Sequence, residues 1–424
     1  MTKYLVIGGS AGGIGAVEAI REVDPMGTLT LISEEHVPQY SRPMISEYVS
    51  REATLDTMKY RGDLFWKNNN VQTLTGRTAV KIDFAKKQVE LDGGDKIDYE
   101  KLLIATGGKP FSPRMEGEDK SGVFTFTELS SAKGLESKLE QSKHAVVIGG
   151  GLIGVSATEA LVKRGIKVTL VELKDSILNL ILDETASELA EKVLSEAGVT
   201  LITGQTVRRI LGRQDNESAV GGVLMTDGTE IPCDIVVIAI GVIPRTELVK
   251  ETDMKLNRGI VVDRFMRTNI PDVYACGDVA EAHDFLTDEN RLLPLWPMAQ
   301  LGGRAAGYNM AGKKAEYEGG TVMSSLKYFD LPVIAVGTVN SEDIGDYELL
   351  LDSQPEKMVY KKIQLKDNAI VGFIFLGDIE KAGIFFRLLK NHVDVSEIKD
   401  SLLSEDFGIV TLPEQLRQEM FVVN

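Results

Sequence analysis

The sequence predicts an α/β protein with two copies of a parallel strand–helix–strand unit, followed by a third domain of α+β type. The first copy has an apolar strand at 4–7, a helical pattern at 11–22 and a second apolar strand at 29–32. The same order returns at 144–172, and from about residue 321 the pattern changes to alternating strands. Short apolar runs bounded by glycine are typical of buried parallel strands joined through a helix.

The second copy is predicted element by element in the same way. We expect strands at 144–148 and 168–172, a glycine loop at 149–151 and a helix at 153–163. An apolar run that ends in glycine, 235–241, is expected to close this sheet. Two similar units about 140 residues apart indicate two domains of one kind rather than a short-period repeat.

Domain boundaries follow from the segments between these units. The Pro- and Gly-rich stretch 110–117 indicates a crossing between domains. Later segments are expected to form a helix from about Gln300, strands at 333–336 and 370–375, and a helical, acidic tail at 391–424. The predicted division is a first α/β domain in two parts (1–112 and 243–320), a second α/β domain (113–242) and a C-terminal α+β domain (321–424) that forms an interface.

Composition excludes several classes of function. The net charge of −16 argues against a nucleic-acid-binding surface, which needs a basic excess. The two cysteines, Cys233 and Cys276, are far apart, so neither a disulfide framework nor a dithiol centre is expected. The four histidines have no metal-site spacing, and we predict no metal. No apolar run is long enough for a membrane span, and the chain begins directly with a strand, so we expect a cytoplasmic protein.

The loop between the first strand and helix has the residues of a dinucleotide site. Gly8 and Gly13 occupy the outer positions of a G-x-G-x-x-G pattern, and the small residue Ser10 stands in the middle. Such a loop places a pyrophosphate against the N-terminus of the helix. An acid after the second strand should bind the ribose, with Glu34 as the first candidate and Glu35 as the second. An ordinary tight turn remains the alternative for this motif taken alone.

The second glycine motif is complete. Gly149, Gly151 and Gly154 follow an apolar strand, and Glu172 ends the next strand. A carboxylate at that point binds a free 2′-hydroxyl and repels a 2′-phosphate, so NADH is favoured over NADPH. Lys174 is close in sequence, and its positive charge would favour a 2′-phosphate instead. The alternative is a glycine turn in a unit that binds no nucleotide.

Five further motifs occur in an order that resembles a known family. They are 40–46 (YSRPMIS), 103–107 (LIATG), 240–247 (IGVIPRTE), 268–278 (TNIPDVYACGD) and 295–304 (LWPMAQLGGR). With the two glycine motifs, they are similar to the pyridine nucleotide-disulphide oxidoreductase superfamily. The match is with the branch of NADH oxidases, rubredoxin reductases and nitrite reductase large subunits. The resemblance implies two domains of the glutathione reductase type and the cofactors FAD and NADH.

The resemblance also implies which residues bind each cofactor. In the family, the aspartate of the 268–278 motif holds a ribityl hydroxyl, and the helix of the 295–304 motif begins beside the flavin. FAD contacts are implied for Gly8, Ser10, Ala11, Gly12, Gly13, Glu34, Glu35, Arg42, Pro43, Ala105, Thr106, Gly107, Gly277, Asp278, Pro297, Met298 and Ala299. NAD contacts are implied for Gly149, Gly151, Leu152, Ile153, Gly154, Glu172 and Gly241.

Four positions depart from the family pattern. Pro43 stands where relatives with a redox cysteine carry that residue, which removes a thiol relay. Glu47 and Ser156 replace a Lys and a Glu that lie beside the flavin N5 in the branch, so no catalytic side chain is certain. Arg245 replaces the usual Asn of its motif.

These motifs predict an enzyme that passes hydride from NADH to the flavin N5. Electrons would then go to O₂ or to a small electron-carrier protein. Two alternatives stay open: a flavoprotein with a mainly binding and redox-signalling role, and an electron-transfer subunit of a larger complex. We expect a homodimer, the commonest symmetric assembly.

Overall fold

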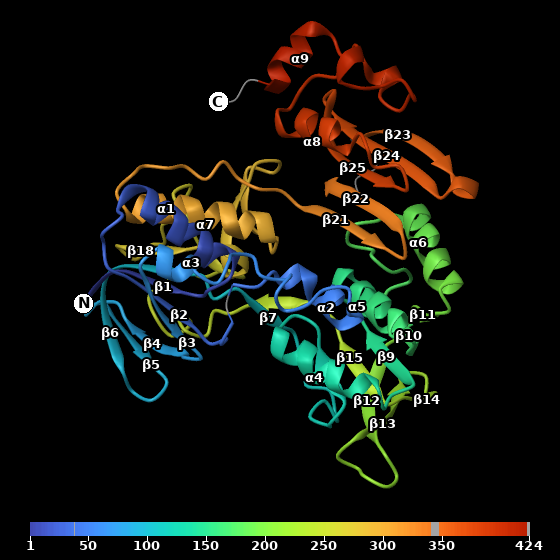
Figure 1. Ribbon diagram of the computed structural model, residues 1–424. Coiled ribbons are helices and arrows are strands. Elements are labelled where there is room, and N and C mark those ends of the chain that lie inside the picture. The colour runs from blue at the N-terminus through green and yellow to red at the C-terminus, as the bar shows by residue number, and fades with distance from the viewer. Residues whose placement is uncertain (38, 341–346, 422–424) are drawn as a thin grey trace. The chain divides into compact units, whose positions relative to one another are not determined.

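The computed structural model describes residues 1–37, 39–340 and 347–421. The chain divides into two compact units, each made of two segments (Figure 1). Unit 1 is Met1–Phe111 with Val242–Gly320, and unit 2 is Ser112–Gly241 with Thr321–Asn424. The predicted division into three domains, the first of them in two parts, remains a prediction beside this result.

Unit 1 is built on a parallel sheet. Across this sheet the strands follow the order β3 (Val71–Thr75), β2 (Leu29–Ser33), β1 (Thr2–Ile7), β6 (Lys96–Ile104) and β18 (Val273–Ala275). The first half of β6 also pairs with β5 (Gln88–Leu91), which pairs with β4 (Ala79–Asp83). Leu5 and Val6 are completely buried because β1 lies inside the sheet and is covered on both faces.

Two helices of unit 1 pack with their backbones in contact. They are α1 (Ala11–Val23) and α7 (Trp296–Met310), which lie side by side in Figure 1. A Cβ atom added at Gly303 would lie 2.0 Å from the carbonyl oxygen of Gly12, and one at Gly307 would lie 2.5 Å from that of Ala16. Glycine is therefore required on this face of α7, and it brings two helix N-termini to one edge of the sheet.

The predicted start of α7 was four residues late, because the helix begins at Trp296 rather than at Gln300. Pro297 lies in its first turn, where the missing N–H has no intrahelical partner to lose.

The remaining helical elements of unit 1 are short: α2 (Ile45–Ser50), α3 (Phe65–Asn68) and the 3₁₀ turns η1 (Arg42–Met44) and η2 (Gly277–Val279). Its remaining strands form the pair β7 (Gly108–Pro110) and β16 (Val242–Pro244), and a small sheet of β17 (Ile260–Val261), β19 (Ala280–Asp284) and β20 (Glu289–Leu292).

Unit 2 contains a second parallel sheet. Its order is β11 (Thr200–Ile202), β10 (Lys167–Val171), β9 (His144–Ile148), β15 (Ile235–Ile238) and β8 (Val123–Thr125). The helices α4 (Leu129–Leu139), α5 (Leu152–Lys163) and α6 (Glu184–Glu196) connect these strands. A small antiparallel sheet of β12 (Val207–Gly212), β13 (Val220–Met225) and β14 (Glu230–Pro232) precedes β15. The predicted βαβ order of both copies is thus observed.

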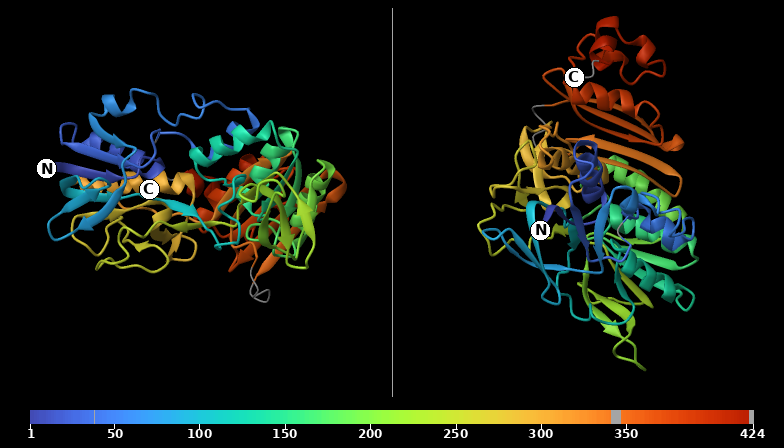
Figure 2. Two further views of the ribbon diagram at one scale, coloured as in Figure 1. Left: turned by 90° about the horizontal axis from the view of Figure 1, so that it is seen from below. Right: turned by 60° about the vertical axis from the view of Figure 1, so that its left-hand side comes forward.

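The C-terminal part of unit 2 is an antiparallel sheet. Its order is β21 (Met323–Tyr328), β22 (Leu331–Gly337), β25 (Ala369–Leu376), β24 (Val359–Lys366) and β23 (Glu348–Gln354). Helix α8 (Ala382–Lys390) covers one face of this sheet (Figures 1 and 2). Its Phe385 packs against Phe373 and Phe375. This confirms the predicted α/β fold with a C-terminal α+β domain.

The prediction of a helical tail was wrong for most of its length. In the described part of 391–424, the only α-helix is α9 (Glu414–Phe421), and 3₁₀ turns occur at Lys399–Ser401 (η5) and Ile409–Thr411 (η6). Buried residues such as Val395, Leu402 and Phe407 anchor this segment by irregular packing. Phe407 contacts Phe385 of α8, so tertiary packing overrides the local helical pattern.

Candidate functional site

The glycine loop of unit 1 has a geometry that only glycine permits. Gly8 has φ +116°, and a Cβ there would lie 2.1 Å from the carbonyl oxygen of Ala105. A Cβ on Gly13 would lie 1.9 Å from the carbonyl oxygen of Gly8. The loop is therefore pressed between the ends of β1 and β6. Gly12 faces the sulfur of Cys276, which a Cβ would approach to 2.8 Å, so this loop also touches the 268–278 motif.

Ser10 is the N-cap residue of α1, with an extended backbone. Its side chain accepts no capping hydrogen bond from the helix, and the first turn carries no acid. Unpaired N–H groups and the positive end of the helix dipole at such a terminus attract an anion. The start of α1 thus fits the pyrophosphate of a dinucleotide.

Both candidate ribose-binding acids lie at the end of β2, and both are held by arginine. Glu34 is paired with Arg245. Glu35 accepts a hydrogen bond of 2.8 Å from the Tyr40 hydroxyl and forms an ion pair of 2.6 Å with Arg42. A carboxylate has about four lone-pair directions, so each acid keeps capacity for a ribose hydroxyl.

The segment after β6 is joined to the segment after β16. The Thr106 hydroxyl donates to the Arg245 carbonyl at 3.0 Å, and the Arg245 N–H donates to the Gly107 carbonyl at 3.0 Å. Gly107 has φ +72°. These bonds place Arg245 beside the predicted FAD residues Ala105 to Gly107. No sequence motif predicts its partner Glu34, which lies 211 residues away along the chain.

Asp278 meets the requirements for a ribityl ligand. It lies in η2, directly after β18, and burial raises the pKa of its carboxyl. Arg42 opposes that pKa shift through its charge, with a smaller effect. Within the described residues, no side chain or backbone N–H of another residue donates a hydrogen bond to this carboxylate. A largely desolvated carboxylate whose donor is its own backbone N–H keeps acceptor capacity for a ligand hydroxyl.

The start of α7 adjoins the same place. A Cβ on Gly277 would lie 3.4 Å from the Cβ of Ala299, so the Gly277–Asp278 turn packs on the first turn of this helix. Met298 contacts Tyr317, whose hydroxyl lies 3.5 Å from its sulfur. Trp296 packs edge-on against Tyr60, with ring centroids 5.1 Å apart. Unit 1 thus brings together the loop after β1, the segment after β6, η2 and the start of α7, which includes Pro297.

The glycine loop of unit 2 repeats this arrangement. Gly149 has φ +108°, and a Cβ there would lie 2.5 Å from the carbonyl oxygen of Ala239. A Cβ on Gly154 would lie 1.8 Å from the carbonyl oxygen of Gly149. Gly151, the N-cap of α5, differs because a Cβ there would meet no atom within 4 Å. The loop is tight on its protein side and open at Gly151, before Leu152 and Ile153 begin the helix.

Glu172 is tied to the same loop. Its Oε2 accepts a hydrogen bond of 2.5 Å from the N–H of Gly150, and its Oε1 accepts one of 2.8 Å from the N–H of Lys174. Gly241, after β15, has φ +114° and open space at its Cβ position. The sequence motif did not identify Gly150, because it is the middle residue of a G-G-G run and not one of the pattern's fixed positions. Its N–H nevertheless orients the Glu172 carboxylate.

The residues that depart from the family pattern lie in different units. In unit 1, Glu47 is half-buried in the first turn of α2 and accepts a hydrogen bond of 2.7 Å from the Ser46 hydroxyl. Pro43 is exposed in η1. Ser156 is half-buried in α5 of unit 2. The placement of Glu47 and Ser156 beside the flavin N5 stays a prediction.

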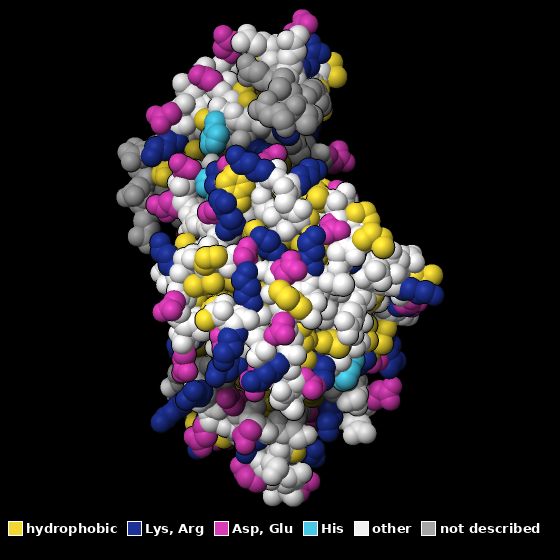
Figure 3. Space-filling model, turned by 90° about the vertical axis from the view of Figure 1, so that its left-hand side faces the viewer, with side chains coloured by type: hydrophobic (Ala, Val, Ile, Leu, Met, Phe, Trp, Pro, Cys, Tyr) yellow, Lys and Arg dark blue, Asp and Glu magenta, His cyan; other side chains and the backbone are white. Residues whose placement is uncertain are grey.

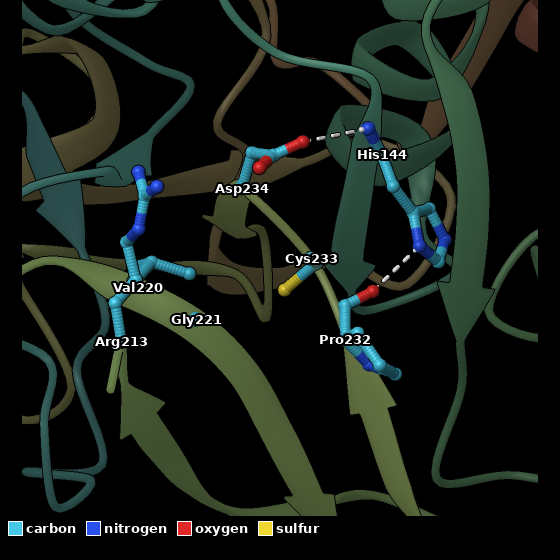
Figure 4. Close-up of a pocket in the computed structure, with 7 residues that line it drawn as sticks. All are labelled: His144, Arg213, Val220, Gly221, Pro232, Cys233 and Asp234. Carbon is cyan, nitrogen blue, oxygen red and sulfur yellow. Dashed lines mark hydrogen bonds between the residues drawn. The ribbon is translucent and has the colours of Figure 1, made fainter. Parts of the chain in front are cut away.

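A pocket of about 350 Å³ lies in unit 2 (Figure 4). It is lined by His144, Arg213, Val220, Gly221, Pro232, Cys233 and Asp234. The His144 Nδ1 lies 2.7 Å from the Pro232 carbonyl oxygen, and the backbone N–H of His144 donates to the Asp234 carboxylate at 3.2 Å. These groups satisfy each other, and none of the predicted nucleotide residues lines the pocket, so it is a separate feature of the fold.

Two parallel sheets, each with a glycine loop and a helix N-terminus at its carboxyl edge, define the class of α/β proteins with two dinucleotide-binding folds. Residues 2–322 match the family described as pyridine nucleotide-disulphide oxidoreductase, and residues 323–393 match the rubredoxin NAD+ reductase C-terminal domain. The chain belongs to the pyridine nucleotide-disulphide oxidoreductase family, which confirms the predicted family and enzyme class. FAD and NADH are the cofactors of this family, as the resemblance implied.

Known proteins resemble the chain over most of its length. It is 30% identical to the nitrite reductase [NAD(P)H] of Bacillus subtilis over 93% of the chain, and 28% identical to the NADH-dependent phenylglyoxylate dehydrogenase subunit epsilon of Aromatoleum evansii over 96%. The chain spans 48% of the length of the first relative and 96% of the second. The NAD-dependent persulfide reductase from A. fulgidus has a similar structure, with a TM-score of 0.87, 27% identity, and coverage of 94% of this chain and 78% of that one.

No helix in the described ranges is long and apolar enough to cross a membrane. Among the same residues, no group of three or more His, Cys, Asp or Glu side chains is arranged to hold a metal ion.

Proposed function

We propose that the chain is an FAD-dependent NADH oxidoreductase that works without a redox-active thiol. The observation that carries this proposal is the pair of loops described above, each closed on its protein side by glycines at the start of a helix, with open space at Gly151 in unit 2. In unit 1, FAD would lie along the carboxyl edge of the sheet, from the acids after β2 to Asp278 after β18. In unit 2, NADH would lie on Gly149–Gly154, with its ribose on Glu172.

The side chains named above would bind and orient the two cofactors. The starts of α1 and α5 would hold pyrophosphates through backbone N–H groups. The start of α7 would place a positive helix end beside the flavin. When bound, FAD accepts a hydride from NADH and passes the electrons onward. No side chain of this chain is required as a nucleophile or general base for that chemistry.

NADH rather than NADPH is proposed as the donor because Glu172 is fixed by two backbone N–H groups. Glu172→Gln removes the negative charge and keeps the side-chain size. We expect the ratio of kcat/KM for NADH over NADPH to fall at least tenfold, about 1.4 kcal/mol. Glu230→Gln, an exposed residue on β14, is the matched control for net charge. An unchanged ratio in Glu172→Gln would contradict the assignment.

The absence of a thiol relay is supported by the state of both cysteines. Cys233 and Cys276 are free and buried, and burial raises the pKa of each thiol to about 12. A relay needs an accessible thiolate. We expect denatured samples to show two thiols per chain both before and after anaerobic reduction with excess NADH. A rise in the thiol count on reduction would establish a disulfide and overturn the proposal.

The electron acceptor is proposed to be O₂ or a small electron-carrier protein. The C-terminal match to the rubredoxin NAD+ reductase domain supports a carrier. The net charge of −16 is unevenly distributed: unit 1 has 24 Lys and Arg against 27 Asp and Glu, whereas unit 2 has 23 against 36. Lys and Arg side chains are numerous on the face in Figure 3, with acidic side chains between them. The overall charge therefore does not exclude an acidic carrier at unit 1.

The deciding measurement is anaerobic stopped-flow reduction of the purified protein by NADH, followed by mixing with O₂, a quinone and an acidic iron–sulfur carrier. Rapid reoxidation by one of them identifies the acceptor class. A protein that purifies without flavin would overturn the proposal.

A second candidate is an electron-transfer subunit, favoured by the match with subunit epsilon along 96% of both chains. Copurification of a stable partner, with slow turnover when alone, would support that role.

A further inference from the structure

The ion pair between Arg245 and Glu34 crosses the edge of the unit 1 sheet where the proposed FAD site lies. Glu34 directly follows β2, Gly8 directly follows β1, and Arg245 is bound through its backbone to Thr106 and Gly107 after β6. In the sheet, β1 lies between β2 and β6. The pair therefore spans the end of β1, a distance of about 10 Å between the outer strands.

FAD in the proposed site must pass the same point. Its adenosine ribose would bind an acid after β2, its pyrophosphate would lie on the Gly8–Gly13 loop after β1, and its ribityl chain would meet Asp278 after β18. This path runs along the sheet edge from β2 to β18, and the Arg245–Glu34 pair bridges its part between β2 and β6.

The surroundings favour a durable pair. The Arg245 side chain is 22% exposed and that of Glu34 is 44% exposed, so the pair is partly shielded from solvent and salt. The Arg245 backbone is fixed by two hydrogen bonds. Glu35 has separate partners in Tyr40 and Arg42, so the pairing of Glu34 with Arg245 does not depend on Glu35.

We infer that Arg245 and Glu34 form a clasp that closes over the adenosine–pyrophosphate half of FAD and slows its release. This inference rests on the proposed function and assigns a task to the arginine that replaces the usual asparagine of the motif. The clasp holds the cofactor only while both partners are present. The two residues should therefore act as one unit when FAD dissociates.

The test measures FAD release from the purified holoprotein by the rise in free-flavin fluorescence after dilution. The variants are Arg245→Asn, Glu34→Gln and the double variant. Each single variant should release FAD about tenfold faster than wild type, and the double variant no faster than either. Lys109→Gln is the matched control, because Lys109 pairs with Glu247 between the same two segments without reaching β2. It should release FAD at the wild-type rate.

Three results would overturn the clasp: wild-type release from both single variants, additive effects in the double variant, or faster release from Arg245→Asn with slower or unchanged release from Glu34→Gln. The third result would mean that Arg245 binds the phosphates itself. Thermal unfolding of the FAD-free variants shows whether the fold is intact. A wild-type protein that purifies without FAD would overturn the proposed function as well, whereas a flavin-containing protein with unaltered release overturns the clasp alone.

Discussion

Gly151→Ala is expected to raise the dissociation constant for NADH about 100-fold and to leave the free energy of unfolding unchanged. A Cβ at Gly151 meets no protein atom within 4 Å, and this glycine does not have the positive φ that disfavours alanine. Protein packing therefore gives no reason for glycine here. A pyrophosphate approaching the backbone would collide with the added methyl group, which removes about 3 kcal/mol of binding energy.

The control for this variant is Gly383→Ala. Gly383 lies in α8 of the same unit and also has open space at its Cβ position. Its replacement should leave NADH binding unchanged and raise the free energy of unfolding by about 0.5–1 kcal/mol, because alanine favours a helix. Calorimetric NADH titration and chemical denaturation separate the two effects. Normal NADH affinity in Gly151→Ala would place the nucleotide elsewhere.

Both parallel sheets could be predicted from the sequence because their signals are local. The runs at 4–7 and 144–148 are β1 and β9, and each is followed by a glycine with positive φ that lies against the end of a neighbouring strand. Gly13 and Gly154 were also predictable, since each packs on the first glycine of its own loop. In both loops the packing that requires glycine joins residues a few positions apart, so the sequence spacing reveals it directly.

Contacts between distant segments could not be predicted in this way. The partner of Arg245 lies at the end of β2, and only the sheet order reveals that these segments meet. The start of α7 was misjudged because Trp296 and Pro297 resemble a loop, whereas the packing of its glycines against α1 fixes the helix. The prediction of a helical tail was wrong for a related reason. Phe407 is held by a contact with Phe385 of α8, not by a helical turn of its own segment.

Asp278→Leu is expected to lower FAD affinity about 100-fold and to make the FAD-free protein more stable by about 1–2 kcal/mol. The carboxylate would lose its hydrogen bond to the cofactor, so binding weakens. In the FAD-free protein, the same carboxylate is desolvated and receives no donor from another described residue. Leucine has a similar branched shape and no charge to desolvate, so unfolding becomes harder. Opposite effects on affinity and stability distinguish a ligand-binding group from a structural one.

The dependence on pH provides an independent check of this assignment. The folded pKa of Asp278 is raised above its ordinary value of 3.8 by burial, so the folded state binds its proton more tightly than the unfolded state. The stability that this proton provides is present below pH 3.8 and is lost as the pH rises through the folded pKa. Chemical denaturation of FAD-free wild type and Asp278→Asn should therefore show a stability difference that grows from pH 3.8 upward and then levels off. A difference that is constant with pH would mean that Asp278 is solvated in the folded protein, and its role as the ribityl ligand would lose its physical basis.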